Sequence, residues 1–256
     1  MSREIFIGDV HGCFEEFSEL LEKLALQPSD RVLLVGDLLD KGPDPAACVR
    51  LARQRRFEAV LGNHEDKFLR FLQHERRAAE EARYTNPMRY GNPADLERAR
   101  ELSAADVAWL ADLPLAIELG DTVVVHGGLL PGQPLQEQIR SKRTRRLVLR
   151  LRWLRNGAHV PLRELDPDAD PRSQGLLHWS ELYDGPAHVV YGHESHNLSR
   201  PHVHRRSDGV ATYGIDTGCV YGGRLTALVK SRDGSIEFVQ VDARRPYARL
   251  LFQREP

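Results

Sequence analysis

The feature that most constrains the fold is an alternation of short apolar runs with amphipathic segments in the first third of the chain. The apolar runs lie at residues 4–7, 31–35 and 58–61. Residues 14–26 place apolar side chains at helical spacing, and a second helix is predicted to begin near Asp44, a favourable capping residue. Because parallel strands need such crossover helices, this order predicts a mainly parallel sheet.

The middle of the chain combines two expected strands with two stretches that we interpret as insertions. Strands are predicted at residues 122–126 and 188–191. Residues 74–112 are polar and mostly helical in pattern, and residues 130–180 are rich in Pro, Arg and Asp. We interpret both stretches as insertions or caps within one domain that spans residues 1–256.

The C-terminal part has the pattern of an antiparallel run of strands. Strands are predicted at residues 211–215, 224–230 and 235–241. Asp233-Gly234 supplies a hairpin turn between the last two. With the helices nearer the N-terminus, this pattern predicts an α/β fold.

The charge is balanced overall but basic in one place. The net charge of the 256 residues is −1, so no global field favours nucleic acid or a membrane. Between Arg140 and Arg155, however, there are eight Lys or Arg and no acidic residue. Two interpretations stay open: a solvated face, or a lid that attracts phosphate.

Cysteine usage and hydropathy indicate the compartment. The three cysteines, Cys13, Cys48 and Cys219, lie far apart, which predicts no disulfide framework and a reducing environment. No apolar run approaches the ~20 residues of a membrane span. Because a polar motif already begins at Gly8, we expect no cleavable leader and a cytoplasmic location.

Five short motifs follow the strand-like runs, and each combines an oxygen or imidazole side chain with a glycine that permits a sharp turn. They are Gly8-Asp-Val-His-Gly12, Gly36-Asp-Leu-Leu-Asp-Lys-Gly-Pro43, Gly62-Asn-His-Glu65, His126-Gly-Gly128 and Gly192-His193. Open α/β sheets bind ligands at this edge. Asp, Asn and His suit Mn²⁺, Fe²⁺ or Zn²⁺, and two such ions joined by a carboxylate can clamp a phosphate and activate water.

In this order the motifs resemble those of the PPP-type metallophosphoesterases. That superfamily includes serine/threonine protein phosphatases and symmetrical diadenosine tetraphosphatases. The segment Gly214–Leu228 is similar to the bacterial, tetraphosphatase-like branch. The resemblance implies a calcineurin-like, four-layer α/β/β/α sandwich with two mixed sheets and a cap insertion.

The resemblance also implies two divalent metal ions, with Mn²⁺ expected first and Fe, Zn, Co or Mg as alternatives. The implied ligands are Asp9 and His11 for the first ion, Asn63, His126 and His193 for the second, and Asp37 as the bridge between them.

The residues that would act on the substrate are implied in the same way. His64 would protonate the leaving group, and Asp40 would orient and charge its imidazole. The family has an arginine at the position of Lys41. An arginine can bind two phosphate oxygens with its planar guanidinium, whereas the lysine ammonium group acts as a point charge. Arg152 is the phosphate-binding arginine that we predict from the basic stretch, with Arg150 in reserve.

The remaining polar candidates are less specific. Asn63 and Tyr221 are expected near the phosphate, although Tyr221 is equally compatible with a place in the core. Four further histidines are predicted to face solvent: His178, His196, His202 and His204.

The function predicted from the sequence is metal-dependent hydrolysis of phosphate esters or anhydrides by direct attack of an activated water. The foremost substrate is a dinucleoside tetraphosphate such as diadenosine tetraphosphate, cleaved symmetrically to two nucleoside diphosphates. Side activity on nucleotides and phosphomonoesters is expected. A phosphoprotein phosphatase is the alternative, favoured by Glu65 of Gly-Asn-His-Glu. A non-catalytic module that binds RNA or phosphate through residues 140–155 is the remote one.

Overall fold

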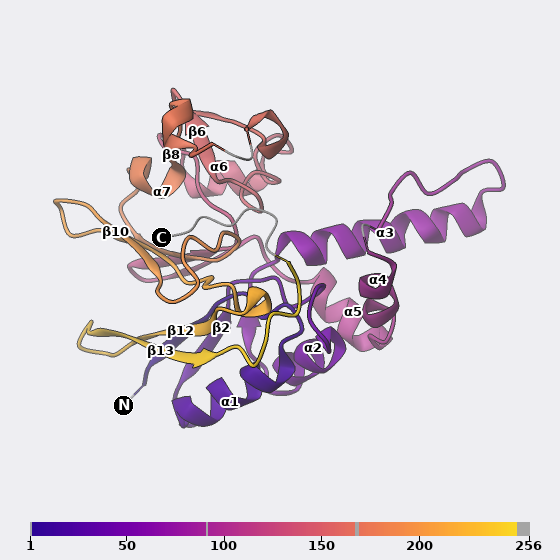
Figure 1. The fold of residues 1–256 in the computed structure, drawn as a ribbon, viewed down its shortest axis with the longest axis horizontal. Helices are drawn as coiled ribbons and strands as arrows, with labels where there is room; N and C mark the ends of the chain where they lie inside the picture. Colours follow the sequence, from indigo (N-terminus) through magenta and orange to yellow (C-terminus); the bar gives the residue numbers. More distant parts are fainter. Residues whose placement is uncertain (1, 91, 167–168, 250–256) are drawn as a thin grey trace.

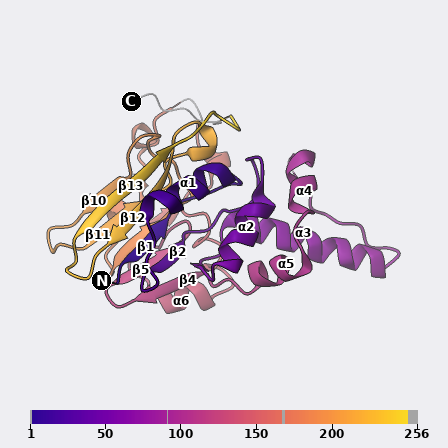
Figure 2. The ribbon, with the colours of Figure 1, turned by 90° about the horizontal axis from the view of Figure 1, so that it is seen from below.

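The chain forms two five-stranded mixed sheets that pack face to face, with helices outside one sheet and a cap outside the other (Figure 1). The structure is a computed structural model that describes residues 2–90, 92–166 and 169–249. Figure 2 shows the same layers from below, with α1 and α2 beneath the first sheet. The four-layer sandwich predicted from the resemblance is therefore confirmed.

The first sheet has the strand order β13-β12-β1-β2-β3. Its parallel half is the predicted N-terminal alternation: β1 (Glu4–Ile7), β2 (Arg31–Leu34) and β3 (Glu58–Ala59). Its antiparallel half is the C-terminal hairpin of β12 (Arg224–Lys230) and β13 (Ile236–Asp242). The sheet thus contains strands from both ends of the chain. The prediction that its first strands are parallel is confirmed.

The crossover helices α1 (Phe14–Leu24) and α2 (Pro45–Gln54) cover the outer face of this sheet. The Asp44 carboxylate caps α2 by accepting from the backbone N–H of Ala47 at 2.8 Å. The third helix, α3 (Asn63–Glu80), begins directly after Gly62. This start places the motif residues in its first turn.

The second sheet has the order β10-β11-β9-β5-β4. Three parallel strands form its centre: β5 (Thr122–Val125), β9 (His188–Tyr191) and β11 (Ala211–Gly214). The antiparallel edges are β4 (Ala116–Leu119) and β10 (His202–Arg205), neither of which the sequence pattern predicted.

The predicted antiparallel run at the C-terminus is wrong in its first strand. Residues 211–214 pair in parallel with β9 in the second sheet, and not with β12. All four residues of β11 are buried, which suits an interior strand that is covered on both faces. A strand-like pattern identifies a strand but does not specify its partner.

Apolar side chains between the two sheets hold them together. Phe6, Leu33 and Val35 of the first sheet belong to the same buried cluster as Val190 and Tyr213 of the second. The two parallel halves consequently end at one common edge. The loops that follow β1, β2, β3, β5 and β9 meet there, and these loops carry the five motifs.

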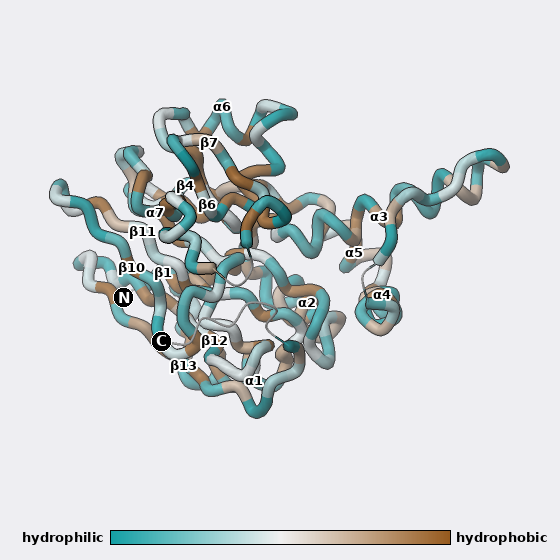
Figure 3. The backbone as a smooth tube through the Cα atoms, turned by 45° about the horizontal axis from the view of Figure 1, so that its top comes forward, coloured by the Kyte–Doolittle hydropathy of each residue, from teal (hydrophilic) through white to brown (hydrophobic). Residues whose placement is uncertain are grey.

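The two predicted insertions lie on different sides of the sandwich. After α3, the chain forms α4 (Pro93–Ala99) and α5 (Ala104–Ala111), which pack near α2 and α3. The far end of α3 projects away from the body and is mostly hydrophilic (Figure 3). No helix in the part of the chain that the structure describes is long and apolar enough to cross a membrane.

The second insertion packs on the outer face of the second sheet. Its elements are α6 (Leu135–Arg140), β6 (Trp153–Arg155), β7 (Ala158–His159), the 3-10 turns η1 (Leu162–Glu164) and η2 (Arg172–Gln174), β8 (Leu177–His178) and α7 (Trp179–Leu182). Strands β7, β6 and β8 form a small third sheet. The fully buried Trp179 and Tyr191 pack this cap onto β9. A last 3-10 turn, η3 (Cys219–Tyr221), precedes β12.

Candidate metal centre

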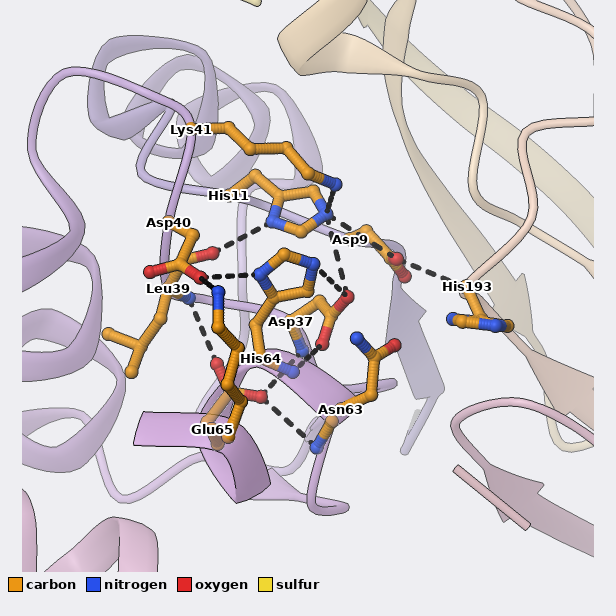
Figure 4. A network of polar contacts seen from close by, with 12 residues as sticks. Asp9, His11, Asp37, Leu39, Asp40, Lys41, Asn63, His64, Glu65 and His193 are labelled. Atoms are coloured by element: carbon orange, nitrogen blue, oxygen red, sulfur yellow. Dashed lines mark hydrogen bonds and ion pairs between the residues drawn. The ribbon is translucent and has the colours of Figure 1, made fainter. Parts of the chain in front are cut away.

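Asp37 lies at the centre of the cluster formed by the five motifs (Figure 4). Its Oδ2 is 3.5 Å from His11 Nε2 and its Oδ1 is 3.3 Å from His126 Nε2. Two groups of potential metal ligands share this aspartate: His11 and His64 on one side, His126 and His193 on the other. This is the arrangement expected of a carboxylate that bridges two cations.

The backbone of these loops is strained in a way that directs the side chains inward. Five non-glycine motif residues have φ between 44 and 70°, in the left-handed region: His11, Asp37, Asp40, Lys41 and His193. Such conformations cost on the order of 1 kcal/mol or more each, so the surrounding structure must enforce them. They are concentrated at this site.

Glu65 is the residue that holds the Asp37 loop in place. It is fully buried, and its carboxylate accepts hydrogen bonds from the backbone N–H groups of Asp37, Leu38, Leu39 and Gly62 at 2.9–3.1 Å. Burial, and then the charge of Asp37, raises the pKa of Glu65 to about 7. The sequence prediction treated Glu65 as an indicator of substrate class, whereas it contacts backbone.

The buried imidazoles are oriented by backbone carbonyls. The Nδ1 atoms of His11 and His126 each lie 2.8 Å from a carbonyl oxygen, that of Leu39 and that of Val35. Donation from Nδ1–H leaves the Nε2 lone pair directed toward Asp37, as in most histidine metal sites.

Two of the imidazoles are also favoured in the neutral form that binds metals. Burial, and then the charge of Lys41, lowers the pKa of His11 well below its usual value. Burial and the charge of Arg152 do the same to the pKa of His193. Both rings are therefore ready to act as ligands at neutral pH.

The buried polar groups of this site favour the binding of cations. Asp9 Oδ1 is buried and accepts no hydrogen bond from any residue that the structure describes. Burial, and then the carboxylate of Asp216, raises the pKa of Asp9 well above its usual value. Side-chain cations contact two of the predicted ligand nitrogens: Lys41 Nζ lies 2.8 Å from His11 Nε2, and Arg152 Nε donates to His193 Nε2 at 3.0 Å. The carboxylate, amide and imidazole groups of the site are donors that fit divalent metal ions.

His64 and Asn63 lie at the start of α3, beside Asp37. His64 Nδ1 is 2.6 Å from Asp40 Oδ2, and its Nε2 is 3.8 Å from Asp37 Oδ2. Asn63 Oδ1 lies 3.0 Å from His126 Nε2. Asp40 also accepts from the Tyr90 hydroxyl at 2.7 Å, so its carboxylate is held on both sides. The structure thus brings together all six predicted metal ligands and the predicted acid.

The basic stretch contributes two arginines to this site and not one. Arg152 contacts His193 with its guanidinium, and it also donates to the His193 backbone oxygen at 3.1 Å. Arg150 donates to the backbone oxygen of Asn63 at 3.2 Å and lies 3.5 Å from Asp66. Of the two interpretations left open for residues 140–155, this placement agrees with the phosphate-attracting one for these two residues.

Tyr221 lies at the rim of the centre, where Lys41 Nζ is 5.0 Å from its ring centroid. The tyrosine is half-buried and also packs against the apolar core. Its position is compatible with both predicted roles, near the phosphate and at the edge of the core.

Two further residues near the site were missed by sequence reasoning. Asp216 is buried and accepts from the backbone N–H of Gly218 at 2.9 Å and from the Ser195 hydroxyl at 2.8 Å. It follows a strand and precedes a glycine, which is the same signal that identified Asp9. Tyr90 lies in an unpatterned loop and carried no such signal.

His178 is one of the four histidines predicted to face solvent. This prediction is wrong, because His178 is 1% exposed. Its ring contacts those of His196 and His202, with centroids 4.5 and 5.9 Å away. All three, like His204, are at least partly covered. The cap strand β8 packs over the loop that follows β9, a long-range contact that local pattern does not reveal.

Comparison with known proteins identifies the family. The family model of the calcineurin-like phosphoesterases matches residues 3–197. A protein of Halalkalibacterium halodurans named bis(5'-nucleosyl)-tetraphosphatase PrpE, asymmetrical, is 30% identical over 98% of each chain. A symmetrical bis(5'-nucleosyl)-tetraphosphatase of Aromatoleum aromaticum is 37% identical over 49% of this chain and 44% of its own.

Solved structures agree with these matches. The crystal structure of a candidate diadenosine tetraphosphatase superposes with a TM-score of 0.68 and 27% identity over 93% of both chains. A protein serine/threonine phosphatase of Saccharomyces cerevisiae, with 17% identity and a TM-score of 0.52 over 94% of this chain and 80% of its own, shows the common fold alone. The chain therefore belongs to the calcineurin-like metallophosphoesterases and is a phosphoester hydrolase, of a family that uses a dinuclear divalent metal site.

Proposed function

We propose that this enzyme hydrolyses dinucleoside tetraphosphates and uses two Mn²⁺ ions to do so. The observation that carries the proposal is the set of three cationic side chains around Asp37: Lys41, Arg150 and Arg152. A tetraphosphate spreads several negative charges along a chain, and separated cations match such a charge distribution. Relatives that align over nearly the whole chain carry the tetraphosphatase name.

The proposed ligands are those predicted from the sequence: Asp9 and His11 for one ion, Asn63, His126 and His193 for the other, and Asp37 for both. When bound, the ions supply Lewis acidity and lower the pKa of water. Asp37 can serve both because its two oxygens face different imidazoles, Oδ2 toward His11 and Oδ1 toward His126.

His64 delivers the proton to the leaving group in this proposal. Asp40 holds Nδ1 at 2.6 Å, which stabilises the imidazolium and directs Nε2 toward the reacting phosphate beside Asp37. The Tyr90 hydroxyl fixes Asp40 from the other side. The chain's own residues therefore position one proton donor at the metal centre.

A cavity beside Lys41 can hold the part of the substrate that extends from the reacting phosphate. Its volume is about 430 Å³, and Asn92, Arg98 and Tyr247 are among the residues that line it. Cationic, amide and aromatic groups together suit a phosphate chain and a nucleoside better than they suit a compact phosphomonoester.

The position of cleavage is a finer question. The sequence favoured symmetrical cleavage, and this stays a prediction. The relatives that match over nearly the full length are named asymmetrical, while the symmetrical relative matches only about half of the chain. For this reason we propose asymmetrical cleavage, to a nucleoside triphosphate and a nucleoside monophosphate.

The alternative of a phosphoprotein phosphatase loses the observation that favoured it. Glu65 is buried and accepts hydrogen bonds from four backbone N–H groups, so its side chain does not face the substrate. Its identity therefore does not discriminate between a nucleotide and a phosphopeptide.

The test is a comparison of kcat/KM, with Mn²⁺ present, on diadenosine tetraphosphate, a phosphopeptide and p-nitrophenyl phosphate. We expect the tetraphosphate to be preferred, and we expect chelation to abolish turnover until Mn²⁺ is restored. Asp37→Asn is the control for contaminating phosphatases. ATP with AMP as products supports asymmetrical cleavage, and ADP alone supports the symmetrical mode. A higher kcat/KM on the phosphopeptide would overturn the substrate proposal.

A further inference from the structure

A second group of potential metal ligands lies outside the centre described above. One ring nitrogen each of His178, His196 and His202 lies within 4.8 Å of the others. The His196 and His202 rings stack with centroids 4.1 Å apart. The three residues come from the end of β8 in the cap, the loop after β9, and β10 of the second sheet, and Figure 1 shows β8 and α7 next to β10.

A carboxylate belongs to this group as well. Glu194 Oε2 lies 3.4 Å from His178 Nε2. Among the residues that the structure describes, neither of these atoms nor His202 Nε2 has a hydrogen-bond partner, although all three are shielded from solvent. Glu194 Oε2 also lies 4.0 Å from Arg152 Nε. Leaving a buried polar atom without a hydrogen bond costs roughly 1–3 kcal/mol, so a partner shared by these three atoms would stabilise the cluster.

The ring of His178 is held on its other nitrogen. Nδ1 lies 2.7 Å from the Ser180 hydroxyl and accepts from the backbone N–H of Ser180 at 3.3 Å. Nε2 faces Glu194 and the other two rings. Metal binding through Nε2 requires the tautomer with the proton on Nδ1, where the Ser180 hydroxyl would accept it.

We propose that these residues form a third metal site, one that binds Zn²⁺ through His178, His196, His202 and Glu194. Tetrahedral zinc, with bonds of 2.0–2.1 Å to nitrogen, places neighbouring ligand atoms about 3.4 Å apart. The His178–Glu194 pair already has this separation. The half-buried His196 and His202 need to turn inward by about 1 Å. Three imidazoles favour Zn²⁺ over the harder Mn²⁺.

Such a site would connect three parts of the molecule. His178 belongs to the cap, His202 to an edge strand of the second sheet, and Glu194 follows the predicted catalytic ligand His193. A bound ion would therefore fasten the cap to the sheet and hold the loop that carries His193. The site is structural in this proposal and is independent of which substrate the enzyme cleaves.

The experiment counts tightly bound zinc per chain by equilibrium dialysis of metal-free protein against Zn²⁺, followed by elemental analysis. We expect three ions in the natural protein and two in His202→Gln and in His196→Gln. His204→Gln, from the same strand as His202 but outside the cluster, is the matched control and should keep three. The buried His178 is left unchanged because its removal would open a cavity in the core.

A second measurement separates this site from the catalytic one. In an Asp37→Asn background, Co²⁺ should still give the intense visible absorption of a tetrahedral site, and His202→Gln should remove it. A circular-dichroism melt without metal verifies that each variant is folded. Equal zinc counts in the natural protein and His202→Gln, or an equal loss in His204→Gln, would overturn the proposal. If the catalytic pair did not form, all counts would fall together and the difference of one would persist.

Discussion

Two clusters of buried and half-buried histidines lie on either side of a single peptide segment, with His193 in the first and His196 in the second. The first cluster, the proposed catalytic one, is built on strained loops at the ends of parallel strands and contains the carboxylate of Asp37. The second cluster lies between the cap and the sheet, and the carboxylate of Glu194 lies 3.4 Å from its His178. Arg152 lies between the two, 3.0 Å from His193 and 4.0 Å from Glu194.

The difference shows what makes a metal site reactive. The first cluster has the ligands to hold two ions that share the carboxylate of Asp37, and His64 and two arginines lie beside it. The second has enough ligands for one closed tetrahedral shell, which leaves no open position for a substrate. The comparison therefore predicts that changes in the first cluster alter turnover, whereas changes in the second alter metal content and stability.

The largest effect should come from Asp37→Asn. Because the substitution weakens both ions together, kcat/KM on diadenosine tetraphosphate should fall by ~10³-fold or more, equivalent to about 4 kcal/mol. Loss of a ligand to one ion, as in His193→Gln, should cost less. His202→Gln should stay within about twofold of the natural enzyme in an assay with saturating Mn²⁺. A large loss in His202→Gln would mean that the two clusters act as one.

His64→Asn should have the next largest effect, and the effect should depend on the leaving group. Substrates with poor leaving groups should slow by ~10²–10⁴-fold, which is the usual range for loss of a general acid. An activated aryl ester should be affected less, because its leaving group needs little protonation. The measurement is kcat on both substrate types. Equal losses would assign His64 to positioning and not to proton transfer.

Arg152, which lies between the two clusters, is expected to contribute to substrate binding. Arg152→Lys keeps the charge but removes the planar fork, so KM for the tetraphosphate should rise by about tenfold. Arg150→Lys should change KM by less, because Arg150 is already engaged by Asp66 and by the Asn63 backbone oxygen. The measurement is KM for the tetraphosphate, from steady-state kinetics on both variants. The opposite order would assign the phosphate contact to Arg150.

The residues of the first cluster could be picked out from the sequence because they follow local rules. A glycine after an apolar strand, together with Asp, Asn or His, identified the positions of Asp9, Asp37 and His126 without any knowledge of strand pairing. Parallel strands share an edge, so the motifs had to meet. The same rule applied to Gly214-Ile-Asp-Thr-Gly would have found Asp216.

The second cluster could not be predicted because no local rule connects its members. His178, His196 and His202 come together only when the cap folds back over the sheet and β10 pairs with β11. The partner of β11 was itself assigned wrongly, since alternation in a sequence does not specify which sheet a strand joins. Glu65 was misinterpreted for a similar reason: its buried contacts to a distant loop are invisible in the motif.

The smallest effect we expect is a change of substrate preference through Lys41, whose ammonium group lies 2.8 Å from His11 Nε2 at the edge of the first cluster. A terminal phosphomonoester is a compact dianion with three free oxygens, which an arginine fork fits well. An internal phosphate of a tetraphosphate has fewer free oxygens, and a flexible lysine can follow the charge along the chain. Lys41→Arg should therefore raise kcat/KM for phosphomonoesters relative to diadenosine tetraphosphate by a factor between about two and ten, or at most about 1.4 kcal/mol. The ratio of the two kcat/KM values is the measurement, and Lys41→Gln is the control for loss of charge. An unchanged ratio in Lys41→Arg would show that the preference for nucleotides resides elsewhere, with the cavity lined by Arg98 and Tyr247 as the next place to test.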